Sequence, residues 1–153
     1  TFEKFAENFN YERAFDGEEE TYFWAISPNA DDYLQVSWPQ KEFPVGHWLR
    51  GVRVATGSAD RPGDRLDSGV LYAAQWLPSE VPGSVHLRWV KLASFAEGRA
   101  EASAEVLARG PISGLQVNCL QRQEKWMTLP EIAVELADPR PHPTADETGE
   151  VER

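Results

Sequence analysis

Apolar and polar residues alternate along much of the chain, in short runs separated by turn-forming residues. A period of two places apolar side chains on one face of an extended strand. The runs lie at residues 22–26, 33–38, 48–56, 69–76, 85–92, 115–119 and 132–136. Glycine, proline, serine and asparagine separate most of them, and these residues favour turns. The succession of short strands predicts an all-β fold, a two-sheet antiparallel β-sandwich rather than a barrel enclosing a channel.

Two segments make more specific predictions. In the run 48–56, the alternation predicts Arg50, Val52 and Val54 on one face, with Leu49 and Ala55 on the other. Residues 93–110 are rich in alanine, glutamate, leucine and arginine, which favour a helix. Alternate small apolar residues nevertheless continue from position 100 to position 106, and tertiary contacts can override propensity. We therefore predict a strand in residues 93–110.

The length of 153 residues suits one domain with a single core. We predict a β-sandwich domain over residues 1–137, opening with an edge strand and loop in residues 1–16. Residues 138–153 contain several prolines followed by threonine, glycine and acidic residues, and predict a disordered, solvated tail. Because the chain begins at Thr1 without a methionine, we expect a processed piece of a longer protein.

The charge balance limits the choice of partners. Fifteen basic and 25 acidic residues give a net charge of −10. Such a charge repels nucleic acid and anionic membranes unless a local basic face overrides it. We expect no nucleic-acid partner and no direct membrane binding by this domain.

Metal ligands and catalytic groups are sparse. Cys119 is the single cysteine, which excludes an internal disulfide and a zinc site built on several thiolates. The three histidines are far apart, so we predict no metal and no cofactor. Asp31–Asp32 and the aspartates at 60, 64 and 67 leave a structural calcium as an alternative, although no calcium-loop pattern is present. No residue has a context that activates a nucleophile or raises a carboxyl pKa, so we predict a non-catalytic domain.

The segment 53–67 is the strongest candidate for a binding site. Two turn signals, at 56–58 and 61–64, gather its polar side chains on a bend that follows a predicted strand. Carboxylates beside guanidinium groups can bind adjacent sugar hydroxyls or a planar anion. The alternative interpretation is a solvated loop with local ion pairs. Among six tryptophans, Trp126 follows a polar turn, and at a loop end its ring could stack on a pyranose.

Several short blocks occur in a characteristic order. They are residues 22–28, 32–33, 56–64, 95–98, 100–101, 111–113, Trp126 and 131–132. Together they resemble the C-terminal lectin domain of the alpha-1,3-mannosyl-glycoprotein 4-beta-N-acetylglucosaminyltransferases, the N-acetylglucosaminyltransferase IV family. The resemblance implies a galactose-binding-like jelly roll of the discoidin type, similar to family 32 carbohydrate-binding modules.

The resemblance also implies a function. In that family the domain is appended to a Golgi glycosyltransferase, binds terminal β-linked N-acetylglucosamine on N-glycans and modulates the catalytic domain. We therefore expect a lectin module with two partners, the glycan and its own catalytic domain. Its expected location is the Golgi lumen, with secretion after cleavage as a further alternative.

The resemblance places the sugar at the aspartate that follows Pro-Gly, which is Asp64 here. This chain departs from the family where it has Ser58 in place of asparagine and Asp60-Arg61 in place of Glu-His. In the predicted site, Asp64 accepts hydrogen bonds from ring hydroxyls. Asp60 and Arg61 flank the sugar, Ser58 supplements them and Trp126 provides the platform. The departures leave open a protein-interaction β-sandwich that has lost sugar binding.

Overall fold

The computed structural model describes residues 23–25, 28–38, 44–58, 60–137, 144–145 and 151–152. The strand and loop predicted in residues 1–16 lie outside these ranges. In chain order the strands are β1 (Phe23–Ala25), β2 (Tyr33–Ser37), β3 (Leu49–Ala55), β4 (Gly69–Pro78), β5 (Ser84–Ser94), β6 (Arg99–Glu101), β7 (Ile112–Cys119), β8 (Met127–Leu129), β9 (Glu131–Leu136), β10 (Thr144–Ala145) and β11 (Val151–Glu152). Helix α1 (Ala104–Leu107) lies between β6 and β7.

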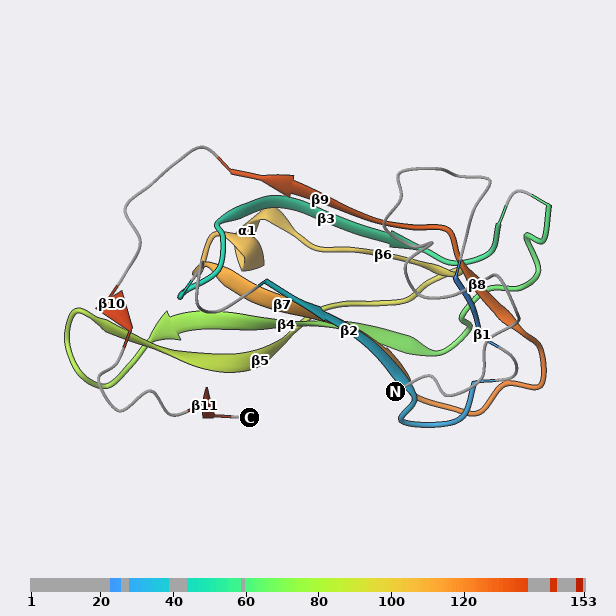
Figure 1. The fold of residues 1–153 in the computed structure, drawn as a ribbon, viewed down its shortest axis with the longest axis horizontal. Helices are drawn as coiled ribbons and strands as arrows, with labels where there is room; N and C mark the ends of the chain where they lie inside the picture. The colour runs from blue at the N-terminus through green and yellow to red at the C-terminus, as the bar shows by residue number, and fades with distance from the viewer. Residues whose placement is uncertain are drawn as a thin grey trace.

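The strands form a sandwich of two facing sheets (Figure 1). One sheet has the order β5-β4-β7-β2, with antiparallel neighbours. The other has the order β6-β3-β9 and is also antiparallel. Strands β1 and β8 pair with each other at the right-hand end of Figure 1. The predicted antiparallel β-sandwich is confirmed.

The core lies between the two sheets. Val52 and Val54 of β3 face Leu71 of β4 and Leu115 and Val117 of β7 in one cluster of buried apolar side chains. All five are almost completely shielded from solvent. Burial of this apolar surface is the main force that holds the sheets together.

Strand β3 departs from the predicted alternation at its start. Leu49 is buried and Arg50 is exposed, so Arg50 does not share the face of Val52 and Val54. The pairing of β3 with β9 shifts register between Leu49 and Gly51. This irregularity turns Leu49 inward and lets Arg50 pair with Glu135, at 3.3 Å from Nε to Oε2.

The single strand predicted over residues 93–110 is wrong. Strand β5 ends at Ser94, a tight turn through Glu97 (φ 52°) and Gly98 (φ 78°) follows, and β6 covers only three residues. Ser103 then starts α1 by accepting a hydrogen bond from the Val106 amide. The buried Gln75 side chain of β4 donates to the carbonyl oxygens of Val106 and Gly110, at 2.8 and 3.0 Å. Tertiary contacts and a cap therefore favour the helix that the local propensity indicated.

Two short strands fall within the segment predicted as a tail. Both β10 and β11 pair with β5 in the parallel direction. The rest of residues 138–153 lies outside the described ranges, and the domain boundary at residue 137 stays a prediction. In the part of the chain that the structure describes, no helix has the length and apolarity that crossing a bilayer requires.

Candidate functional site

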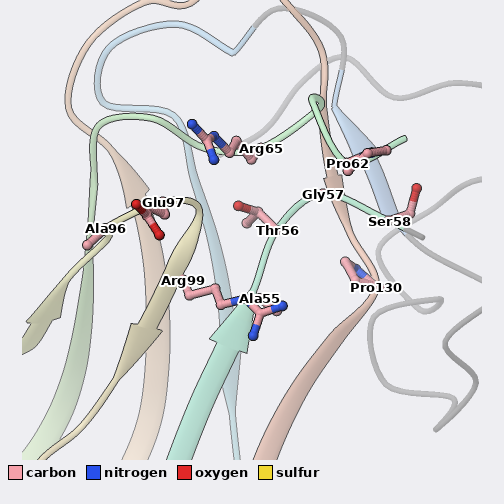
Figure 2. A pocket seen from close by; sticks show the side chains of 10 residues that line it. All are labelled: Ala55, Thr56, Gly57, Ser58, Pro62, Arg65, Ala96, Glu97, Arg99 and Pro130. Carbon is pink, nitrogen blue, oxygen red and sulfur yellow. The ribbon is translucent and has the colours of Figure 1, made fainter. Parts of the chain in front are cut away.

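A pocket of about 690 Å³ opens where β3 ends and β6 begins (Figure 2). Its walls are the loop that follows β3, the turn between β5 and β6, and Pro130 between β8 and β9. Figure 2 shows Arg65, Glu97 and Arg99 around Thr56, with Ser58 beyond Gly57. The loop predicted to carry a site therefore forms one wall of a pocket at the end of the sandwich.

Thr56 joins the two walls. Its hydroxyl donates to the Gly98 carbonyl at 2.6 Å and accepts from the Leu66 amide at 2.9 Å. Its own amide donates to the same Gly98 oxygen at 2.8 Å. Because these bonds are buried, Thr56 fixes the pocket's shape rather than offering its hydroxyl to a ligand. The sequence showed this residue only as part of a turn signal.

Two glycines make room for Arg65. Gly57 and Gly98 both have a positive φ, of 82° and 78°. A Cβ added at Gly98 would lie 2.8 Å from Cβ of Arg65, and one added at Gly57 would lie 3.5 Å from the same atom. The Arg65 stem therefore runs between the two glycines, a path that side chains at either position would narrow or block.

Ser58 and Asp60 come together as predicted. The Ser58 hydroxyl donates to Oδ1 of Asp60 at 2.8 Å, and Ser58 lines the pocket. Asp60 is exposed, whereas Ser58 is buried. The serine thus orients the carboxylate at the rim of the loop, and its contribution to sugar binding stays a prediction.

Asp64 and Arg61 lie on the same loop but outside the lining of this pocket. Nη1 of Arg61 is 4.0 Å from Oδ2 of Asp64, and the Asp64 side chain is 23% exposed. The Asp64 carbonyl accepts from both the amide and the hydroxyl of Thr128, at 2.8 and 3.2 Å. The backbone at Asp64 is therefore anchored to β8 while its carboxylate keeps some contact with solvent.

Trp126 immediately precedes β8 and is half-buried. It does not line the pocket beside Thr56. Its carbonyl accepts a long hydrogen bond of 3.4 Å from the Gln123 side chain. The role of Trp126 as a sugar platform stays a prediction.

Gln123 is a structural residue that the sequence reasoning missed. Its amide nitrogen lies 3.0 Å from the Arg65 carbonyl, and its oxygen accepts from the Asp67 amide at 3.2 Å. These bonds fasten the end of the loop to the segment before Trp126. A glutamine in a polar run gives no signal of this role, because Arg65 and Asp67 lie 58 and 56 residues away in the sequence.

Carboxylates of the loop face hydroxyl groups or cations. Asp60 accepts from Ser58, Asp64 lies near Arg61, and Asp67 accepts from Nζ of Lys125 at 3.0 Å. Within the described ranges, no group of three or more histidine, cysteine, aspartate or glutamate side chains is arranged to hold a metal. The structural calcium and the absence of a cofactor stay predictions.

Comparison with solved structures identifies the class of fold. The chain is similar to chitosan-binding module 1 of a chitosanase/glucanase from Paenibacillus sp. IK-5, with a TM-score of 0.57 and 14% identity over 86% of this chain and 89% of the module. It is also similar to CBM32-1 of a family 31 glycoside hydrolase from Clostridium perfringens, with a TM-score of 0.53 and 11% identity over 86% and 88%. An F5/8 type C domain from Bacteroides fragilis matches with a TM-score of 0.50 and 18% identity over 84% and 81%. The chain has the galactose-binding-like β-sandwich fold of these domains, and the predicted fold class is confirmed.

Comparison of sequences adds particular relatives. The chain is 26% identical over 114 residues to an alpha-1,6-mannosyl-glycoprotein 4-beta-N-acetylglucosaminyltransferase of Gallus gallus, covering 74% of this chain and 23% of the relative. It is 24% identical over 130 residues to an alpha-1,3-mannosyl-glycoprotein 4-beta-N-acetylglucosaminyltransferase C of Sus scrofa, covering 84% and 26%. No family model matches the chain.

The chain thus spans about a quarter of the length of these curated relatives. The similarity is weak and is consistent with a divergent member of their family. The predicted resemblance, that of a divergent member of this family, is confirmed.

Proposed function

We propose that this chain is a non-catalytic carbohydrate-binding module of a glycosyltransferase, and that it binds terminal β-N-acetylglucosamine of N-glycans. The observation that carries the proposal is the loop after β3, where the partly exposed Asp64 carboxylate lies 4.0 Å from Arg61, at one end of a sandwich whose fold is shared with carbohydrate-binding modules. The similarity to two N-acetylglucosaminyltransferases supports the choice of glycan.

In the proposed complex the sugar lies on the loop face between Asp60 and Asp64. The partly exposed Asp64 carboxylate accepts hydrogen bonds from ring hydroxyls, and Arg61, 4.0 Å away, donates to the sugar from the same side. Asp60, oriented by Ser58, accepts from a further hydroxyl. Trp126 supplies the apolar face.

A binding role suits the chemistry of the loop better than a catalytic one. The Ser58 hydroxyl is buried and donates to a carboxylate, so it is not presented for attack on a substrate. Asp64 and Arg61 lie outside the lining of the pocket and are partly exposed, and a single sugar in such an open site binds with a Kd on the order of millimolar. Attachment to an enzyme that acts on the same glycan raises the effective concentration. We therefore place the domain in the Golgi lumen, beside its own catalytic domain.

Titration with the methyl β-glycoside of N-acetylglucosamine, followed by amide NMR shifts of the full chain, tests this function. We expect saturable shifts in residues 58–65 and their loss in Asp64→Ala. Glu80→Ala removes an exposed carboxylate in the turn after β4 and is expected to bind normally. Absence of shifts, or an undiminished response in Asp64→Ala, would refute the proposal.

One observation favours a second function, protein interaction. Val36 and Trp38 next to β7, with Ile132 and Val134 of β9, line an apolar groove of about 300 Å³. Leu136, at the end of β9, is 57% exposed. A partner that is retained by Asp64→Ala in the presence of excess sugar would favour this function.

A further inference from the structure

The lining of the pocket beside Thr56 contains more cations than carboxylates, in a protein that is acidic as a whole. Arg65 and Arg99 line it together with a single carboxylate, that of Glu97. The whole chain has a net charge of −10, so acidic residues outnumber basic ones in the chain, whereas basic residues outnumber acidic ones in the pocket lining. At physiological ionic strength, charges more than about 8 Å away are largely screened, so the groups that act on a ligand here are the lining side chains and their direct neighbours, Asp67 at 3.6 Å from Arg65 and Asp60 at 2.8 Å from the Ser58 hydroxyl.

Arg65 keeps donors for a ligand. Gly57 and Gly98 leave room for its stem, and its side chain is 45% exposed. Its Nε lies 3.6 Å from Oδ1 of Asp67, which is longer than a hydrogen bond. Asp67 is bound more closely by Lys125, at 3.0 Å. Asp67 therefore pairs with both cations, and its contact with Arg65 is the longer one, which leaves N–H donors of Arg65 for a ligand.

Arg99 enters the pocket from a different element. It opens β6 opposite Ala55 of β3, and its side chain lies beside Ala55 in Figure 2. Among the residues that the structure describes, none forms an ion pair with the Arg99 guanidinium. Two guanidinium groups thus reach one pocket from two walls, an arrangement that suits a carboxylate or sulfate.

The remaining lining argues against a neutral ring held by stacking. The apolar part of the wall consists of Ala55, Pro62, Ala96 and Pro130, and no aromatic residue is among the lining residues within the described ranges. Without an aromatic platform, charge-assisted hydrogen bonds are the strongest interactions available to a ligand here.

We propose that this pocket is a subsite for an acidic sugar, a glycan unit that bears a carboxylate or a sulfate. Arg65 and Arg99 bind the anionic group, and Glu97 accepts a hydrogen bond from a ring hydroxyl. The inference rests on the proposed carbohydrate-binding function and adds to it a second ligand class and a set of residues distinct from Asp64.

The test compares matched ligands by amide NMR titration of the full chain. The probes are methyl β-glucuronide, methyl β-glucoside 6-sulfate, neutral methyl β-glucoside and inorganic sulfate. We expect the two acidic sugars to shift residues 55–58 and 96–99 at concentrations where the neutral sugar does not. Stronger shifts from inorganic sulfate than from either acidic sugar would overturn the assignment to a sugar.

Arg99→Gln removes one cation from an exposed position. It is expected to weaken glucuronide binding about tenfold, the lower end of the range for a charged hydrogen bond. The matched control is Arg109→Gln, in the exposed turn after α1, which should bind as the parent does. Raising the salt concentration should weaken glucuronide binding in the parent more than in Arg99→Gln. Equal binding by parent and Arg99→Gln would overturn the inference.

The two proposals fail in different ways. Normal binding of N-acetylglucosamine at Asp64, with no glucuronide shifts near Arg99, would refute the acidic subsite alone. Loss of the N-acetylglucosamine response with retention of glucuronide binding would refute the proposed glycan and support the subsite. A chain that binds none of these sugars would refute both.

Discussion

Replacing Thr56 with valine tests whether one buried hydroxyl holds the pocket together. Valine keeps the shape of threonine but removes the donor to the Gly98 carbonyl and the acceptor for the Leu66 amide. The Gly98 oxygen retains the hydrogen bond from the amide of residue 56, so it loses only one of its two hydrogen bonds to this residue. The Leu66 amide is left without this partner in a buried setting.

The expected cost follows from these two bonds. Leaving a buried donor unsatisfied costs about 1–3 kcal/mol, and losing the second bond adds about 0.5–1.5 kcal/mol. A methyl group in place of the hydroxyl offsets part of this, so we expect a net loss of about 2–3 kcal/mol. For a chain of this size, that corresponds to a fall in Tm of roughly 5–10 °C.

Urea unfolding followed by tryptophan fluorescence measures this difference, and Thr56→Ser is the matched control. Serine retains the hydroxyl and loses only a methyl group, so we expect it to cost about 1 kcal/mol or less. The valine variant should also change the amide shifts of residues 96–99, on the opposite wall. A free energy of unfolding within about 0.5 kcal/mol of the parent would refute the role assigned to this hydroxyl.

Two further predictions concern the backbone and the thiol. Gly98→Ala should destabilise the protein more than Gly83→Ala, because both positions have positive φ but only at Gly98 would the new Cβ meet another residue, 2.8 Å from Arg65. Equal melting temperatures of the two variants would contradict this reasoning. Burial, together with the nearby Asp31 and Asp32, raises the pKa of the Cys119 thiol above 9.0, although a hydrogen bond with the backbone of Gln121 opposes the shift. As pH rises, the thiol therefore ionises in the unfolded chain before it ionises in the folded one. The stability that the neutral, buried thiol contributes is complete below pH 9.0 and is lost as pH rises through the folded pKa. Unfolding free energies measured across this range should fall less in Cys119→Ala than in the parent, and parallel curves would contradict the assignment.

Much of the fold could be predicted because alternation is a local signal. Strands β2, β3, β4 and β9 lie close to the predicted runs. Polar and apolar residues alternate along most of β2, β3 and β9, whereas β4 is buried along most of its length. The short helix was missed because Ala100, Ala102, Ala104 and Val106 alternate with polar residues through this segment. What decides between helix and strand there is the cap at Ser103 and a buried glutamine from another strand.

The candidate site was only partly predictable. Turn chemistry located the loop after β3, and it placed Ser58 beside Asp60 correctly. The opposite wall of the pocket was not foreseen, because the contact between Thr56 and Gly98 joins residues 42 positions apart. The local sequence shows which residues lie in a turn. Only the pairing of the strands shows which other turn they contact.

A crystal structure of the chain soaked with methyl β-N-acetylglucosaminide tests the central claim most directly. The account predicts density for the sugar on the loop at residues 58–65, with a carboxylate oxygen of Asp64 within hydrogen-bond distance of a ring hydroxyl. Loop residues free of sugar at saturating concentration, or a sugar bound only on another face of the sandwich, would contradict it.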